Sequence, residues 1–201
     1  MNSSPQANSV RNLENLYSVV IGLGLSLGMY NLVDASQSPI PLKGKLLPFF
    51  GSYLVTLIPF YHGALRHLDA RYIEGVDPNA IALLGDFFVL FLESCIFFAL
   101  ALLLSSPSYY TCALVALFIV DSVWGGVSRM LFSSARPESQ WAFLNAIIAV
   151  VLVVLLALMH GLPPKIPDPT GADLAYAVLA ISVGRTVVDY RMTWKFYFPS
   201  A

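Results

Sequence analysis

Two acidic side chains, Glu93 and Asp121, lie within stretches of the chain that are otherwise strongly apolar. If these stretches are membrane-spanning helices, both carboxyl groups lie roughly 16–18 Å from the same end of the bundle, near the bilayer midplane. Only about four residues join the two stretches, so the helices should be antiparallel neighbours. Two carboxylates in a medium of low dielectric constant cannot both ionise comfortably. The pair predicts a site that holds or shuttles a proton or binds a cation, with a purely structural pair as the alternative.

A second polar group is expected closer to that end of the bundle. Asp86 lies seven residues before Glu93, on the same face of one helix, and is assigned to ion or proton handling. Asp86 and Arg185 each fall about 8 Å from the end, which predicts an ion pair between them. The alternative for Arg66 and Asp189 is snorkelling to the lipid headgroups. A vestibule or gate is assigned to four residues on other helices: His62, Arg66, Arg185 and Asn145.

Six apolar runs of about 20 residues can position these side chains. The chain has 201 residues, of which 57% are hydrophobic and only 11% are charged. Soluble proteins have roughly 25% charged residues, so the composition predicts an all-α polytopic membrane helix bundle, a single transmembrane domain of residues 1–201. The run 46–65 contains Pro48, Gly51 and Pro59, and a re-entrant or interfacial segment is the alternative there. The six expected transmembrane helices are 15–33, 46–65, 81–104, 109–132, 142–161 and 172–190.

The distribution of basic residues predicts the orientation. With six spans, one side of the membrane carries both termini and seven basic residues, and the other side carries three. Because short cytoplasmic loops are enriched in Lys and Arg, both termini are expected in the cytoplasm. The seven are Arg11, Arg66, Arg71, Arg129, Arg136, Arg191 and Lys195, and the three are Lys43, Lys45 and Lys165.

Small residues and aromatic residues indicate how the helices pack and where the chain meets the interface. Gly24 with Gly28, and Ala180 with Gly184, have the small-x-x-x-small spacing that lets another helix approach closely, within the protomer or between protomers. The segment 191–201 combines basic and aromatic residues, so we expect an interfacial C-terminal tail on the inner leaflet, with docking on another subunit as the alternative.

Several chemistries lack the residues they need. The net charge of −1, with the 11 Lys and Arg residues scattered, gives no basic stripe for nucleic acid. The two cysteines have no metal-ligand spacing, and His67 and His160 are expected on opposite sides of the membrane, so no metal site and no cofactor are predicted. The string from Gly24 to Gly28 matches G-x-S-x-G, but it lies inside an apolar helix rather than at a strand-to-helix turn. A role other than catalysis is therefore favoured.

Three functions fit these observations, in decreasing order. The first is a small oligomeric channel or transporter for a proton, cation or small solute. The second is a membrane anchor or sensor subunit, binding a membrane or cytoplasmic protein partner through Arg-rich loops and the aromatic tail. The third is an intramembrane enzyme acting on a lipid. The expected partners are the lipid bilayer and further copies of the chain, in a membrane that the sequence does not identify.

Overall fold

Six long α-helices account for most of the chain in the computed structural model. The structure describes residues 5–34, 36, 41–74, 80–131, 136–161 and 172–199. These residues form no β-strand, which confirms the all-α fold class. A short 3-10 helix precedes α2 and a π-helical turn follows it. In order, the elements are α1 (Pro5–Leu32), η1 (Gly44–Leu46), α2 (Leu47–Leu68), η2 (Asp69–Glu74), α3 (Ala80–Leu102), α4 (Pro107–Leu131), α5 (Arg136–Gly161) and α6 (Ala172–Tyr197).

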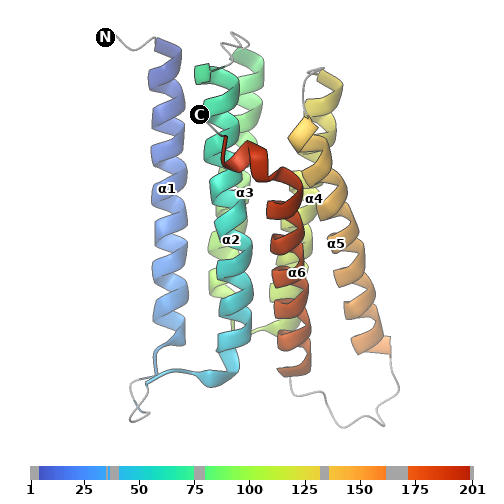
Figure 1. Cartoon of the computed structure of the whole chain (residues 1–201). Helices are drawn as coiled ribbons and strands as arrows, with labels where there is room; N and C mark the ends of the chain where they lie inside the picture. Colours follow the sequence, from blue (N-terminus) through green and yellow to red (C-terminus); the bar gives the residue numbers. More distant parts are fainter. Residues whose placement is uncertain are drawn as a thin grey trace.

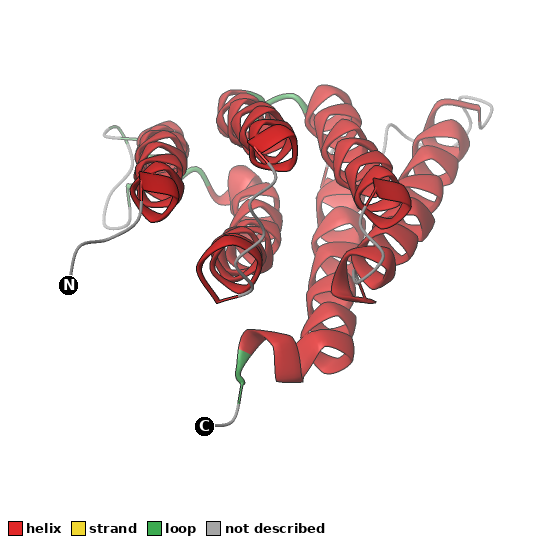
Figure 2. Ribbon diagram, turned by 90° about the horizontal axis from the view of Figure 1, so that it is seen from above, coloured by secondary structure: helices red, strands yellow, loops and turns green. Residues whose placement is uncertain are grey.

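The helices run side by side and alternate in direction, so that both ends of the chain lie at one end of the bundle (Figure 1). The most extensive packing pairs are α4 with α5, α2 with α6 and α1 with α3. The view from above shows α1, α2 and α3 grouped beside α4, α5 and α6 (Figure 2). Side chains from α2 through α6 can therefore meet inside the bundle.

Three of the described helices are long and apolar enough to cross a membrane. They are Ala80–Leu102, Pro107–Met130 and Pro137–Met159, with mean hydropathies of 2.1, 1.7 and 3.0. Large apolar side chains such as Phe88 and Val150 are more than 60% exposed on this surface. An outer surface of this kind is stable in lipid rather than in water. The helices support a membrane protein.

Helix α2 continues through Pro59 without a break. Proline has no N–H, so the carbonyl oxygen of Val55, four residues earlier, loses its helical donor. The Thr186 hydroxyl on α6 donates a hydrogen bond to that oxygen at 2.8 Å. A neighbouring helix thus satisfies the freed carbonyl, and the run predicted at 46–65 is one continuous helix.

Three helices extend beyond their expected limits. Helix α1 begins at Pro5 rather than at residue 15, and α5 begins at Arg136 rather than at residue 142. Helix α6 reaches Tyr197 rather than residue 190, with non-helical torsion angles at Thr193. The helical windings at these ends are too polar for a search based on apolar runs to include them.

Glycine spacing has different consequences on α1 and α6. A methyl group on Gly24 would lie 3.1 Å from the Tyr53 hydroxyl, and one on Gly28 would lie 3.0 Å from the Phe50 ring. Both glycines therefore let α1 approach its neighbours closely. In contrast, Gly184 has open space beside it and Ala180 is exposed, so this pair faces away from the bundle.

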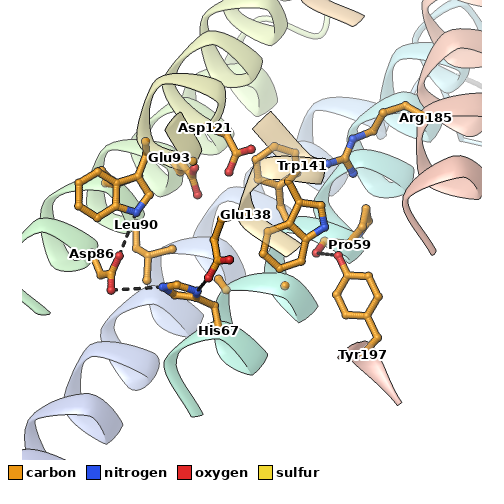
Figure 3. A pocket seen from close by; sticks show the side chains of 16 residues that line it. Pro59, His67, Asp86, Leu90, Glu93, Asp121, Glu138, Trp141, Arg185 and Tyr197 are labelled. Atoms are coloured by element: carbon orange, nitrogen blue, oxygen red, sulfur yellow. Dashed lines mark hydrogen bonds and ion pairs between the residues drawn. The ribbon is translucent and has the colours of Figure 1, made fainter. Parts of the chain in front are cut away.

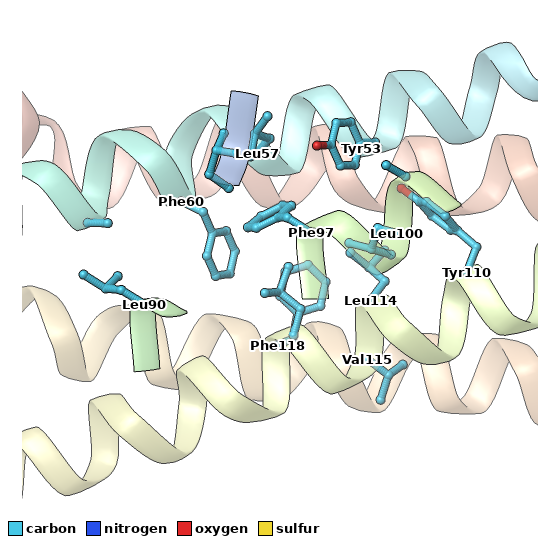
Figure 4. Close-up of a cluster of buried hydrophobic side chains, with 14 of the residues drawn as sticks. Tyr53, Leu57, Phe60, Leu90, Phe97, Leu100, Tyr110, Leu114, Val115 and Phe118 are labelled. Atoms are coloured by element: carbon cyan, nitrogen blue, oxygen red, sulfur yellow. The ribbon is translucent and has the colours of Figure 1, made fainter. Parts of the chain in front are cut away.

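A packed apolar core fills the half of the bundle remote from the termini (Figure 4). The ring of Phe97 lies 5.5 Å from that of Phe60 and 6.1 Å from that of Tyr53, centre to centre. Nearby, the Tyr110 hydroxyl donates to the Phe49 carbonyl oxygen at 3.1 Å. The polar side chains gather in the other half.

Candidate functional site

A cavity of about 60 Å³ lies inside the bundle, between α2, α3, α4, α5 and α6. A water molecule needs about 10–15 Å³ of such space, so the cavity can hold about four waters or one small ion. Figure 3 shows the side chains around it. The lining consists of Pro59, Phe60, Gly63, Ala64, His67, Asp86, Val89, Leu90, Glu93, Asp121, Trp124, Gly125, Glu138, Trp141, Arg185 and Tyr197.

Glu93 and Asp121 meet at this cavity from adjacent helices. Their carboxyl groups lie within hydrogen-bonding reach of each other, and Glu93 is only 3% exposed. The Asn145 side-chain amide donates a hydrogen bond to Asp121. In turn, the Arg185 Nε donates to the Asn145 side-chain oxygen at 3.0 Å. The amide therefore connects the guanidinium group on α6 to the acidic pair.

Asp86 is held by donors from three other elements. The Tyr72 hydroxyl donates to Asp86 Oδ2 at 2.6 Å and the Trp124 indole N–H donates to Oδ1 at 2.9 Å. His67 Nε2 and an Arg71 guanidinium nitrogen lie 3.3 and 3.7 Å from Oδ2. So many donors stabilise an ionised carboxylate at a site that is 1% exposed.

The predicted ion pair between Asp86 and Arg185 is wrong. Arg185 lies 3.0 Å from the carboxylate of Asp189, one turn along its own helix. Its guanidinium group also lies 4.8 Å from the centre of the Phe60 ring. Equal depth placed the two side chains at one level, but Arg185 turns toward α4 and α5 whereas Asp86 turns toward η2.

Asp189 is fully buried, so the snorkelling alternative is wrong for this residue. Besides Arg185, it accepts hydrogen bonds from the Trp141 indole N–H at 2.8 Å and from the Tyr197 hydroxyl at 3.2 Å. The Thr193 hydroxyl adds a third at 3.2 Å. These donors fix the end of α6 against α5.

His67 and Glu138 are site residues that the sequence analysis missed. His67 Nδ1 lies 3.0 Å from Glu138 Oε1, and its other nitrogen faces Asp86, so the imidazole bridges two carboxylates. The second carboxyl oxygen of Glu138 is buried and accepts no hydrogen bond from the described residues. Because α5 begins at Arg136, Glu138 lies on a helix and not in the loop in which it was expected.

Two of the predicted vestibule residues lie outside the cavity lining. His62 stacks on the Tyr197 ring at 4.6 Å. Arg66 forms two hydrogen bonds with Glu74, at 2.7 and 2.9 Å. The hydrogen bond from Arg66 lowers the pKa of the Glu74 carboxyl group. Both residues contact the C-terminal end of the chain instead of the acidic pair.

The charge balance of the lining favours cations. Four carboxyl groups line the cavity, but only Arg185 and His67 supply positive charge there. Negative potential in a cavity with apolar walls concentrates protons and small cations. Within the described residues, no three His, Cys, Asp or Glu side chains are grouped so as to hold a metal ion. The site suits a proton or a monovalent cation.

Comparisons with known protein families, curated proteins and solved structures gave no match to this chain.

Proposed function

We propose that this chain is a multi-pass membrane protein that moves a proton or a small monovalent cation, with Glu93 and Asp121 as its central site. The proposal includes six spans with both termini in the cytoplasm. The unequal distribution of Lys and Arg supports this orientation, and the alternating helix directions agree with an even number of crossings.

One observation carries the proposal, namely the approach of the Glu93 and Asp121 carboxyl groups beside a water-sized cavity. An ionised carboxylate can only accept a hydrogen bond, so two carboxyl groups that bond to each other must hold a proton between them. That proton, or a cation that replaces it, is the species we propose to move. Intramembrane carboxylates of this kind are expensive to bury and mark ion or proton pathways.

The apolar core favours a transporter over an open channel. Beyond the cavity, Phe60, Phe97 and Phe118 fill the interior, with Phe60 and Phe118 ring centres 6.0 Å apart. An ion crossing this layer would lose its hydration without gaining polar partners. We therefore propose that the helices rearrange to expose the acidic pair to the opposite side.

The outward-facing Ala180 and Gly184 support the proposed homo-oligomer. Their small side chains leave the surface of α6 open to a second helix. Replacing Gly184 with leucine should then shift the purified protein toward the monomer, as measured by light scattering in detergent, whereas Gly22→Leu on α1 should not.

Flux measurements on the purified protein in liposomes test the transport proposal. Separate gradients of protons, sodium, potassium and uncharged glycerol are imposed across the same vesicles. We expect flux of protons or of one alkali cation above that of empty vesicles, and no glycerol flux. Glycerol flux without cation flux, or no flux of any solute, would contradict the proposal.

A further inference from the structure

The C-terminal end of α6 bends across the neighbouring helices. Thr193 has torsion angles of φ −112° and ψ 17°, outside the helical region. Beyond it, the chain turns away from the axis of α6 and passes in front of the bundle (Figure 1). We call residues 193–198 the C-terminal segment. A single non-helical residue between two helical parts is a natural position for a hinge.

The inner face of this segment seals one side of the cavity. Tyr197 lines the cavity and is only 4% exposed. Its hydroxyl donates to a carboxylate oxygen of Asp189 at 3.2 Å and lies 3.3 Å from the carbonyl oxygen of Pro59. A methyl group on Gly63 would lie 3.2 Å from the same hydroxyl, so the absence of a side chain there makes room for it.

A second contact fastens the segment to α2. The Arg66 Nε donates a hydrogen bond to the Phe196 carbonyl oxygen at 3.1 Å, and its guanidinium group lies 5.6 Å from the centre of the Phe196 ring. The bidentate pair with Glu74 holds Arg66 in this orientation.

The outer face of the segment has a different character. Trp194 is 58% exposed and Phe198 is 47% exposed, and Lys195 is exposed between them. Trp and Lys side chains of this kind are typical of the interface between lipid and water. The segment thus has one face on the cavity and one face available to the headgroup region.

We propose that the C-terminal segment is a lid, which covers the cavity when Tyr197 is seated against Pro59 and Asp189 and uncovers it when the segment swings about Thr193. The lid regulates access to the site described above, so its purpose rests on the proposed function. Its closure does not, because closure is a property of these contacts alone.

Cysteine labelling tests the lid without any transport assay. Ala64, on the cavity wall, is replaced by cysteine in a chain in which Cys95 and Cys112 are changed to alanine. The rate of modification by a methanethiosulfonate reagent carrying a trimethylammonium group is then measured in detergent. The lid variants are Tyr197→Ala and Arg66→Gln. Trp194→Ala is the matched control, because it removes an aromatic ring from the outer face only.

Tyr197→Ala should raise the labelling rate by about tenfold, since it removes more closing free energy than one hydrogen bond supplies. Arg66→Gln should raise it by a smaller factor, and Trp194→Ala should leave it unchanged. If both lid variants label as slowly as the parent, or Trp194→Ala labels as fast as Tyr197→Ala, the lid is overturned. Size-exclusion profiles of all variants identify any that fail to fold, and Arg66→Gln then decides.

Flux measurements on the same variants separate the two proposals. If labelling follows the expected order but no variant moves ions, the lid is correct and the transport proposal fails. If the parent moves ions but labelling is the same in all variants, transport is supported and the lid is overturned.

Discussion

The carboxyl group of Glu93 on α3 lies within hydrogen-bonding reach of that of Asp121 on α4 (Figure 3). This arrangement is unfavourable for stability, because two buried acids repel each other when both are ionised. Asn145 and Arg185 offset part of that cost from one side. Unfavourable groups that persist in a fold are characteristic of functional sites, where activity is retained at some expense of stability.

Replacing Glu93 with glutamine should therefore abolish ion flux without lowering thermal stability. The amide keeps the shape of the side chain and can donate a hydrogen bond to Asp121, while the like-charge repulsion is removed. Melting in detergent and flux in liposomes are measured on one preparation. Glu14→Gln on α1, a half-buried glutamate outside the cavity, is the control. A clear fall in melting temperature for Glu93→Gln would favour a structural pair instead.

The contact between His67 and Asp86 should be energetically coupled. A double-mutant cycle with His67→Gln and Asp86→Asn is expected to give an interaction energy of about 0.5–3 kcal/mol, as for other contacting residues. The cycle of Asp86→Asn with Asp173→Asn is the control, because Asp173 is exposed in the first turn of α6. Unfolding free energies in detergent supply the numbers. Additive effects of the His67 and Asp86 substitutions would show that the 3.3 Å approach has no energetic weight.

Gly125 and Gly126 are adjacent in sequence but should respond differently to alanine. A methyl group on Gly125 would lie 2.7 Å from the Glu138 carbonyl oxygen and 2.8 Å from the Ala142 methyl carbon. Gly125→Ala must therefore push α5 away from α4, at a cost of about 1–3 kcal/mol. Gly126 has open space, so Gly126→Ala should be neutral or stabilising by about 0.5–1 kcal/mol.

Thermal unfolding of the two glycine variants, side by side, gives the comparison. Equal melting temperatures for Gly125→Ala and Gly126→Ala would show that α4 and α5 do not approach as closely as the structure places them.

The sequence reveals the acidic pair because cost marks it. Carboxylates within runs such as Ala80–Leu102 stand out against apolar neighbours, and the short link to α4 requires the two helices to be adjacent. Depth along the membrane follows from the rise per residue, so Glu93 and Asp121 could be placed at one level.

Direction around the helix is harder to predict than depth. Arg185 and Asp86 have similar depths, yet each finds its partners on other helix faces. Helix ends are harder still, because polar turns carry no apolar signal. Glu138 and Trp141 lie in the first turns of α5, six residues or fewer after Arg136, and so were outside the predicted span. His67 was assigned to the end of its helix, although its ring reaches into the cavity.

The most direct test of the central claim is ion flux through the double variant Glu93→Gln/Asp121→Asn. It is measured in liposomes under an imposed membrane potential and compared with the parent and with Glu14→Gln/Asp173→Asn, which removes the same two charges outside the cavity. The account predicts that the control moves ions at the parental rate and that the cavity variant does not exceed empty vesicles, although it folds. Parental flux through the correctly folded cavity variant would contradict the account.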